Sequence, residues 1–330
     1  MQEITEKNSE TDGMAFLYDF SIVVPCFNEA ASIQEFHNRL VATLKKTDLR
    51  FEVIYVNDGS MDGTFECLQQ FRAAGGLPIC LVDLVQNVGQ TNALTAGLQY
   101  AAGRHIIFLD CDLQVVPEDM LLLIEKFDDS YDMVGGARVQ RKDNLFRVHF
   151  SRMGNAFIRR VLGLPLRDFG SGMKILNGAF VRAFEPGPFR PINPGAMMLS
   201  LRNVAEVPIT HHARKSGRSR WTLRRFFALY HNIFKHLVPF IYPFTVVPLM
   251  LSSLLLFSYF ALATFFPDRF HYSEQPALMP MLLTFNITLS FVCFLLLGEF
   301  VLRGSGQVQE PAYIVRRVFP SKNTRNTPVA

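Results

Sequence analysis

Short apolar runs, each followed by polar residues, recur along the first part of the chain. Their sequences are SIVVPCF, FEVIYVND, PICLVDLV, HIIFLDCD and DMVGGAR, and stretches of helical character separate them. Uninterrupted apolar strands are typical of a sheet that helices cover on both faces. The alternation predicts an α/β domain with a parallel or mixed sheet over residues 21–220, preceded by a polar tail at 1–20.

Two later stretches, 237–267 and 275–298, contain no Asp, Glu, Lys or Arg. At about 1.5 Å per residue, each stretch is long enough to cross about 30 Å of hydrocarbon as a helix. We therefore predict transmembrane helices at 238–267 and 277–302, joined by a connector at 268–276. The alternative is a helical hairpin buried in a soluble core, which the length of uncharged sequence disfavours.

Positive charges flank both uncharged stretches, whereas the connector PDRFHYSEQ carries one Arg against Asp268 and Glu274. By the positive-inside rule, the α/β domain and both termini are cytoplasmic, residues 303–330 form a cytoplasmic tail, and the connector faces outward. The location this implies is the inner (plasma) membrane. The flanking cations are Arg214, Lys215, Arg218, Arg220, Arg224, Arg225 and Lys235 on one side, and Arg303, Arg316, Arg317, Lys322 and Arg325 on the other.

The segment at 221–237, WTLRRFFALYHNIFKHL, directly precedes the first uncharged stretch. Its aromatic residues recur at helical spacing with cations at the margins, which predicts an amphipathic helix in the lipid headgroup layer. A solvent-exposed helix is the alternative. Because the basic residues gather beside the predicted spans and the formal net charge is only +4, we expect a lipid bilayer and no nucleic acid among the partners.

Neither a secretory signal nor a disulfide framework is predicted. The first residues, MQEITEKNSETDG, are polar and acidic and contain no apolar core. The five cysteines form no CxxC pair and no spacing typical of disulfide or zinc frameworks, so we expect them to be reduced.

Polar residues follow the first four predicted strands, which is where ligands bind in open α/β sheets. Carboxylates and amides are prominent among them and indicate a site for a nucleotide and a metal ion. No GxGxxG motif follows a strand, which disfavours a dinucleotide-binding dehydrogenase. The residues are Pro25, Asn28 and Glu29 after the first strand, Asn57, Asp58, Gly59 and Ser60 after the second, Asn87, Gly89 and Gln90 after the third, and Asp110, Asp112 and Gln114 after the fourth.

The acidic pair Asp110 and Asp112 is the strongest candidate for a metal site. An extended segment presents side chains two residues apart on the same side, so both carboxylates can face one ion. Hard oxygen ligands suit Mg²⁺ or Mn²⁺ that bridges a diphosphate and neutralises the charge of a leaving group. The alternative is that an aspartate caps a helix beginning near Pro117.

Two further segments have both a chemical and a structural interpretation. Residues 57–64 form a predicted tight turn, and Asp58 is either part of that turn or an acceptor of hydrogen bonds from a base or ribose. Residues 167–174, RDFGSGMK, combine a carboxylate, glycines and the cation Lys174, so that backbone N–H groups and a cation can approach a phosphate. An ordinary turn with a surface ion pair is the alternative for the second segment.

Six motifs occur in the order seen in family 2 glycosyltransferases: PCFNEA, VNDGSMDGT, QNVGQTNALTAG, DCDLQ, RDFGSGMK and EVPITHHARKSGRSR. With two predicted C-terminal spans, the chain resembles the polyprenyl-phosphate glycosyltransferases, a group that includes dolichol-phosphate mannose synthase and bacterial undecaprenyl-phosphate sugar transferases. The resemblance extends over residues 21–317. It implies a GT-A fold, which is a Rossmann-like mixed sheet, and a homo-oligomer such as a tetramer.

The resemblance also implies an inverting reaction that is metal-dependent and moves a sugar from a nucleotide-diphosphate sugar to a polyisoprenyl phosphate. A UDP-sugar and undecaprenyl phosphate are the preferred substrates, because bacterial members are similar. The implied roles are nucleoside binding by Pro25, Asn28, Glu29 and Asp58, metal and diphosphate binding by Asp110, Asp112 and Gln114, donor-phosphate binding by Arg214, lipid-phosphate binding by Arg138, Ser171 and Lys174, and acceptor positioning or base catalysis by Asp168.

Two alternatives to this function are a processive polysaccharide synthase and a non-catalytic membrane scaffold. Processive synthases usually carry a QxxRW motif, whereas Gly217 stands at the relevant position before Arg220 and Trp221, and two spans are few for a polymer channel. Retention of the acidic pair and of Arg214 disfavours a scaffold. The chain also departs from its relatives in carrying Gln86 where they usually have Arg, and its DFGSGMK loop matches no sugar-specific subgroup.

Overall fold

The computed structural model describes residues 16–139, 160, 165–168, 170–192, 194–212, 247, 249–258, 265, 283–292, 294 and 311–321. Contacts divide the chain into two units. One consists of Met1–Ser219 together with Glu310–Ala330, and the other of Arg220–Gln309. The predicted amphipathic helix at 221–237 lies outside the described residues, as do parts of both predicted spans.

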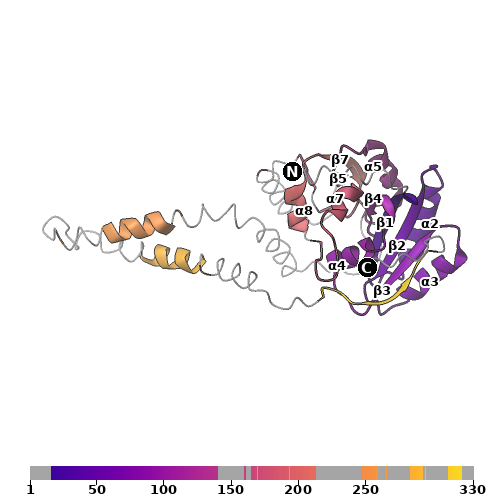
Figure 1. Ribbon diagram of the computed structural model, residues 1–330, viewed down its shortest axis with the longest axis horizontal. Helices are drawn as coiled ribbons and strands as arrows, with labels where there is room; N and C mark the ends of the chain where they lie inside the picture. Colours follow the sequence, from indigo (N-terminus) through magenta and orange to yellow (C-terminus); the bar gives the residue numbers. More distant parts are fainter. Residues whose placement is uncertain are drawn as a thin grey trace. The chain divides into compact units, whose positions relative to one another are not determined.

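An eight-stranded mixed sheet with the order β7-β5-β6-β4-β1-β2-β3-β8 forms the centre of the first unit (Figure 1). Strands β6 and β8 run antiparallel to their neighbours, and the other pairs are parallel. This arrangement confirms the predicted α/β fold of the GT-A type. The strands are β1 (Tyr18–Cys26), β2 (Phe51–Asn57), β3 (Ile79–Leu84), β4 (Gly103–Phe108), β5 (Met133–Val139), β6 (Lys174–Leu176), β7 (Val204–Thr210) and β8 (Val315–Phe319).

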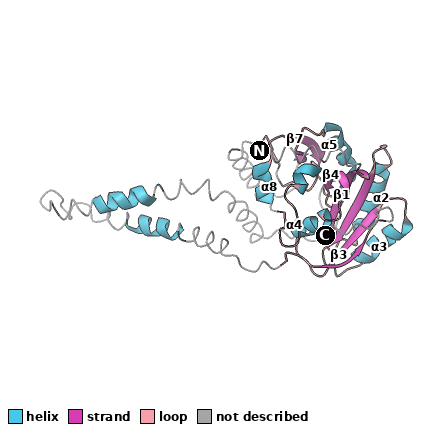
Figure 2. Cartoon of the chain, viewed as in Figure 1, coloured by secondary structure: helices cyan, strands magenta, loops and turns pink. Residues whose placement is uncertain are grey.

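Helices cover both faces of the sheet, which explains why its central strands are apolar throughout (Figure 2). Helix α4 packs closely because Gly97 has no side chain: a Cβ there would lie 2.5 Å from Val23 Cγ1 and 2.9 Å from Val56 Cγ2. The helical elements are α2 (Ile33–Leu44), α3 (Thr64–Ala74), α4 (Gln90–Leu98), the 3-10 helix η1 (Pro117–Asp119), α5 (Met120–Lys126), α7 (Gly178–Arg182) and α8 (Pro194–Ser200).

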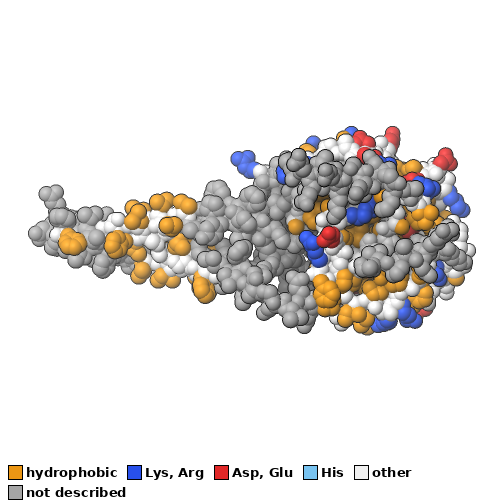
Figure 3. Space-filling view, viewed as in Figure 1, with side chains coloured by type: hydrophobic (Ala, Val, Ile, Leu, Met, Phe, Trp, Pro, Cys, Tyr) orange, Lys and Arg blue, Asp and Glu red, His pale blue; other side chains and the backbone are white. Residues whose placement is uncertain are grey.

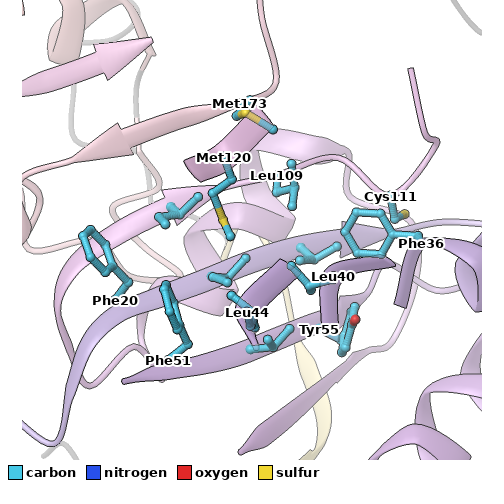
Figure 4. Packing of buried hydrophobic residues seen from close by; sticks show 14 of the residues in the cluster. Phe20, Phe36, Leu40, Leu44, Phe51, Tyr55, Leu109, Cys111, Met120 and Met173 are labelled. Atoms are coloured by element: carbon cyan, nitrogen blue, oxygen red, sulfur yellow. The ribbon is translucent and has the colours of Figure 1, made fainter. Parts of the chain in front are cut away.

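Helix α2 packs on the opposite face from α4, through side chains spaced three and four residues apart (Figure 4). Phe36 and Leu40 are fully buried in one cluster with Tyr55 of β2. Full burial of each such side chain stabilises the fold by about 1.5–3 kcal/mol. The core therefore holds the strand ends in place while the residues beyond them remain available for a site.

His37 on α2 makes the stability of this core depend on pH. Its ring stacks on Phe71 with centroids 4.1 Å apart, and its Nδ1 lies 3.0 Å from the Tyr55 hydroxyl oxygen. Burial lowers the pKa of His37 from 6.5 to about 4. Between these values the unfolded chain binds a proton that the folded chain does not, so the free energy of unfolding falls as the pH decreases through this window.

Replacing His37 with glutamine removes this proton uptake. We expect the variant to lose less unfolding free energy than the wild type between pH 6.5 and pH 5, whatever its stability at pH 7. Urea unfolding of both proteins across this range measures the difference. Parallel pH profiles would show that His37 is protonated equally in the folded and unfolded chains.

Residues 311–321, which fall within the predicted cytoplasmic tail, extend the sheet as β8 and add to its β3 edge (Figure 1). The Tyr313 hydroxyl donates to Gln99 Oε1 at 2.8 Å, and the Ala312 N–H donates to the Pro188 carbonyl at 2.7 Å. Arg317 lies 3.6 Å from the buried carboxylate of Asp83 on β3. The strand was not foreseen because two arginines interrupt its short sequence, VRRVF, and resemble a basic flank.

A Tyr313→Ala variant tests whether this segment belongs to the fold. Tyr313 is 3% exposed, so truncation of its ring is expected to lower the free energy of unfolding by about 3 kcal/mol. The neighbouring Ile314 is 58% exposed, and Ile314→Ala should change stability by less than about 0.5 kcal/mol. Urea unfolding of the two variants measures both values, and equal effects would contradict docking of the segment.

The second unit contains helical residues at 249–258 and 283–292 whose large apolar side chains are exposed (Figure 3). Leu255 and Phe257, for example, are 69% and 73% exposed. Polar groups instead pair between the two segments: the Asn286 side-chain amide donates to the Ser252 hydroxyl at 3.2 Å and to the Ser253 hydroxyl at 3.0 Å. None of the helices that the structure describes is both long and apolar enough to cross a membrane.

Candidate active site

The predicted site residues that the structure describes lie at one edge of the sheet. Parallel pairing brings the carboxyl ends of β1, β2, β3 and β4 to this edge. Strand β6 is antiparallel to β4 and β5, so Lys174 at its start comes to the same edge as Arg138 near the end of β5. The topology therefore joins the predicted nucleotide and metal residues to the predicted phosphate-binding residues.

The loops after β1 and β2 are tied together by the residues predicted to bind a nucleoside. Asn28 has a φ of 52°; its backbone N–H donates to the Ser60 hydroxyl at 3.1 Å, and its side-chain oxygen accepts from the Met61 N–H at 2.8 Å. The Glu29 N–H donates to the Thr64 hydroxyl at 2.8 Å. Asn28 and Glu29 thus organise the rim of the site through their own hydrogen bonds.

Asp58 is buried and organises the loop that follows β3. Its carboxylate accepts hydrogen bonds from the Asn87 side-chain amide at 2.7 Å, the Val88 N–H at 2.7 Å and the Gly89 N–H at 3.1 Å. Neighbouring Gly59, with a φ of 65°, approaches so closely that a Cβ would lie 2.5 Å from the Gln86 carbonyl carbon. In this structure Asp58 therefore shapes the predicted nucleoside site by holding its loops.

The acidic pair lies directly after β4. Gln90 at the start of α4 donates from Nε2 to Asp110 Oδ1 at 2.6 Å, and the backbone of Gly172 lies so close that a Cβ would overlap the Asp110 carboxylate. Asp112 Oδ1 accepts the Gln114 N–H at 3.1 Å. The loop at 170–173 thus lies against Asp110, a juxtaposition that residue spacing alone does not indicate.

The electrostatics of the pair fit a divalent cation. Burial and the charge of Asp112 raise the pKa of Asp110, whereas Lys174, Arg138 and the hydrogen bond from Gln90 lower it, and the pKa is about 6 as a result. Among the described residues, no group of three or more His, Cys, Asp or Glu side chains could hold a metal by itself. Mg²⁺ is commonly held by one or two carboxylates together with substrate phosphates, and this pair matches that ligand set.

Arg138 and Asp168 form a buried pair beside the acidic residues. Arg138 donates from Nε to Asp168 Oδ2 at 2.7 Å and from Nη2 to Oδ1 at 2.9 Å. Only 13% of the arginine side chain and 7% of the aspartate side chain are exposed. The aspartate thereby fixes the plane of the guanidinium, whose remaining N–H groups point in directions set by that plane.

Lys174 completes the cationic side of the site. Burial lowers its pKa, whereas the carboxylates of Asp168 and Asp110 raise it. The charges of both the acidic pair and the Arg138–Asp168 pair therefore act on its ammonium group. Ser171, which is also buried, accepts a hydrogen bond from the Met173 N–H at 3.4 Å within the same loop.

Glu206 of β7 is a member of this region that was assigned no role from the sequence, although it is the first residue of the quoted motif EVPITHHARKSGRSR. Its carboxylate accepts the N–H of Arg167 at 2.7 Å and the N–H of Asp168 at 2.8 Å. Gln90 and Gly172 stood in quoted motifs but received no role. Pro25 contributes its carbonyl to the Cys111 thiol at 3.4 Å, and Arg214 lies outside the described residues.

Comparison with known proteins identifies the family of the chain. Residues 21–183, which include the acidic pair, most of β1 and the strands from β2 to β6, match Glycosyl transferase family 2. The undecaprenyl-phosphate 4-deoxy-4-formamido-L-arabinose transferase of Klebsiella pneumoniae (strain 342) is 30% identical over 321 residues, covering 92% of this chain and 94% of that protein. The chain belongs to glycosyl transferase family 2.

A second relative and a solved structure are also similar to the chain. The transferase of the same name from Edwardsiella ictaluri (strain 93-146) is 32% identical over 217 residues, which are 64% of this chain and 66% of that protein. The crystal structure of a mycobacterial protein matches with a TM-score of 0.50 and 19% identity, covering 72% of this chain and 78% of that one. At this identity the structural match shows the fold alone.

Proposed function

We propose that the chain transfers a sugar from a UDP-sugar to undecaprenyl phosphate, or a related polyisoprenyl phosphate, with inversion at the anomeric carbon and with Mg²⁺ or Mn²⁺. One observation carries the proposal: an acidic pair suited to a diphosphate-bound cation lies beside the loop at 170–173, together with Lys174 of β6 and with Arg138 of β5, which Asp168 orients. The site thus has one side for a departing diphosphate and another for an incoming phosphate. The Klebsiella and Edwardsiella relatives, whose names specify undecaprenyl phosphate, support this acceptor.

Charge explains why such an enzyme requires cations more than a base. A phosphate monoester has a second pKa of about 6, so at pH 7 it is largely a dianion and already a nucleophile. The acceptor oxygen forms a bond to the anomeric carbon while the bond from that carbon to the diphosphate oxygen breaks. Part of the activation barrier is the repulsion between the acceptor phosphate and the donor diphosphate. Arg138 and Lys174 lower this part of the barrier by binding the acceptor phosphate.

The donor side holds the leaving group. Asp110 and Asp112 would bind the metal ion, which when present stabilises the negative charge of the departing nucleoside diphosphate. Gln90 holds one oxygen of Asp110 and so orients its carboxylate. Asp58 keeps the loop at 87–89 in position beside the nucleoside.

The pairing of Asp168 with Arg138 favours a positioning role over a base. We expect Asp168→Asn to reduce kcat tenfold or less, because the acceptor needs no deprotonation, and to raise the KM for the acceptor, because Arg138 loses its orienting carboxylate. Steady-state rates against both substrates separate these effects. A fall in kcat of several orders of magnitude would instead assign Asp168 as an obligatory base.

A bilayer location is part of the proposal. The large apolar side chains exposed at 249–258 and 283–292, with polar groups paired between the segments, suit a lipid environment, in which unpaired polar groups are costly. We propose two spans with a cytoplasmic catalytic domain, on the basis of the flanking cations. The lipid acceptor stays in the bilayer, so such an anchor holds the site at headgroup height.

The test is a transfer assay with the full-length protein in detergent. The protein is incubated with Mg²⁺, undecaprenyl phosphate and a panel of nucleotide sugars that includes UDP-4-deoxy-4-formamido-L-arabinose, and the lipid product is weighed by mass spectrometry. We expect the lipid mass to increase by one sugar residue with one or a few donors. Polymer formation, or no glycolipid with any donor, would overturn the proposal.

A further inference from the structure

We propose that Glu206 is a positioning residue for the acceptor phosphate, acting through Asp168 on Arg138. The inference rests on the proposed function, because it assigns a role within the acceptor side of that site. Glu206 belongs to neither the acidic pair nor the predicted phosphate-binding set. Its two hydrogen bonds nevertheless determine where the loop carrying Asp168 lies.

The first step is the contact between β7 and the loop. The two carboxylate oxygens of Glu206 accept from successive backbone N–H groups, Oε2 from Arg167 at 2.7 Å and Oε1 from Asp168 at 2.8 Å. Hydrogen bonds to an ionised acceptor are roughly twice as strong as those between neutral groups. A two-point contact fixes both the position and the rotation of this short backbone segment.

The second step leads from the backbone of Asp168 to Arg138. With its backbone held by Glu206, Asp168 accepts from Arg138 Nε at 2.7 Å, from Nη2 at 2.9 Å and from the Arg138 backbone N–H at 3.3 Å. Both side chains are largely buried, so neither has much room to reorient. A shift of the loop would therefore rotate the guanidinium or break the pair.

The sheet register aligns Lys174, Gly135 and Glu206 in one row across strands β6, β5 and β7. Glu206 of β7 pairs with Gly135 of β5, and Gly135 in turn pairs with Lys174 of β6. A Cβ added at Gly135 would meet nothing within 4 Å, so open space lies over the middle of this row. Neighbouring strands are about 4.8 Å apart, so Glu206 and Lys174 flank a gap two strand spacings wide.

The test uses Glu206→Gln, which keeps the shape of the side chain but places an NH₂ group against one of the two backbone N–H donors. Asp132→Asn is the matched control. Asp132 Oδ2 also accepts two successive backbone N–H groups, from Arg202 at 2.7 Å and Asn203 at 2.9 Å, but at the opposite end of β5 and β7. Each variant removes the charge of a carboxylate that accepts two successive backbone N–H groups, and only Glu206 adjoins the proposed site.

Rates are measured against undecaprenyl phosphate and against the nucleotide sugar. For Glu206→Gln we expect the KM for the acceptor to rise about tenfold, a change of about 1.4 kcal/mol, with the KM for the donor within about twofold of wild type. Asp132→Asn should leave both values within about twofold of wild type. Equal KM values for Glu206→Gln and wild type, or equal increases in the two variants, would overturn the inference.

A double-mutant cycle with Asp168→Asn determines whether Glu206 acts through Asp168. Rates are measured below the unfolding temperature of every variant, so the cycle remains decisive even if Glu206→Gln is less stable. The acceptor KM of Glu206→Gln/Asp168→Asn should lie within about twofold of that of Asp168→Asn alone. If the increases in acceptor KM of the two single variants multiply in the double variant, Glu206 does not act through Asp168. Absence of transfer by the wild type would overturn the proposed function and this inference together, whereas an active wild type with an unaltered variant overturns the inference alone.

Discussion

An Asp112→Ala enzyme is expected to transfer sugar at least about a thousandfold more slowly than the wild type, which corresponds to about 4 kcal/mol of lost transition-state stabilisation. The reason is that the leaving diphosphate develops negative charge beside two carboxylates, which repel it unless they hold a cation. Burial and the charge of Asp112 already raise the pKa of Asp110 to about 6, so the pair alone would repel that diphosphate. Removing Asp112 leaves one carboxylate to hold the ion.

The exposed Asp48 provides a control, because it precedes β2, at the opposite end of this strand from Asp58, and Asp48→Ala should leave the rate unchanged. Calorimetric titration with UDP in the presence and absence of Mn²⁺ provides a second measurement. Binding by the wild type should depend on the ion, and binding by Asp112→Ala should be weak in both conditions. Full activity of Asp112→Ala in excess Mn²⁺ would exclude the metal assignment.

A Gly172→Ala enzyme is expected to lose about a hundredfold in rate, because misplacement of a reacting group by about 1 Å can cost this much. A Cβ at Gly172 would overlap the Asp110 carboxylate, which the Gln90 amide holds from another direction. Either the carboxylate moves away from the ion or the loop with Lys174 moves away from the acceptor. The substitution therefore affects both sides of the site with one carbon atom.

Gly187→Ala is the matched substitution, since a Cβ there would make an ordinary contact, 3.6 Å from Gln99 Nε2. It should retain the wild-type rate and a similar unfolding midpoint. Rates and thermal unfolding of both variants separate loss of catalysis from loss of structure. Wild-type activity in Gly172→Ala would show that the loop does not lie against Asp110 in the working enzyme.

The central strands could be predicted from the sequence because their apolar runs are long and uninterrupted, and each expected run is a strand from β1 to β5. The later strands were missed for separate reasons. Strand β6 has only three residues, β7 contains Pro208 among polar positions, and β8 carries two arginines. Their places depend on pairing with distant strands, which local sequence patterns do not report.

The location of the site could also be predicted, because polar residues after parallel strands must meet at one edge. The hydrogen-bonded pairs within the site could not be predicted. Asp58 was expected either in a turn or at a nucleoside, and the structure shows its carboxylate binding a loop that follows a different strand. The Asp168–Arg138 pair likewise joins residues far apart in sequence. Side chains with many possible partners are assigned by tertiary packing, not by their neighbours in the chain.

The central claim is that an acceptor phosphate, held by Arg138 and Lys174, attacks the sugar directly. The most direct measurement supplies the full-length enzyme with its best nucleotide sugar and either undecaprenyl phosphate or undecaprenol, which has the same chain and an alcohol in place of the phosphate. Glycosylation of undecaprenyl phosphate alone is the predicted result. Transfer to undecaprenol at a comparable rate would contradict the claim, because an alcohol offers no anion for those cations to bind.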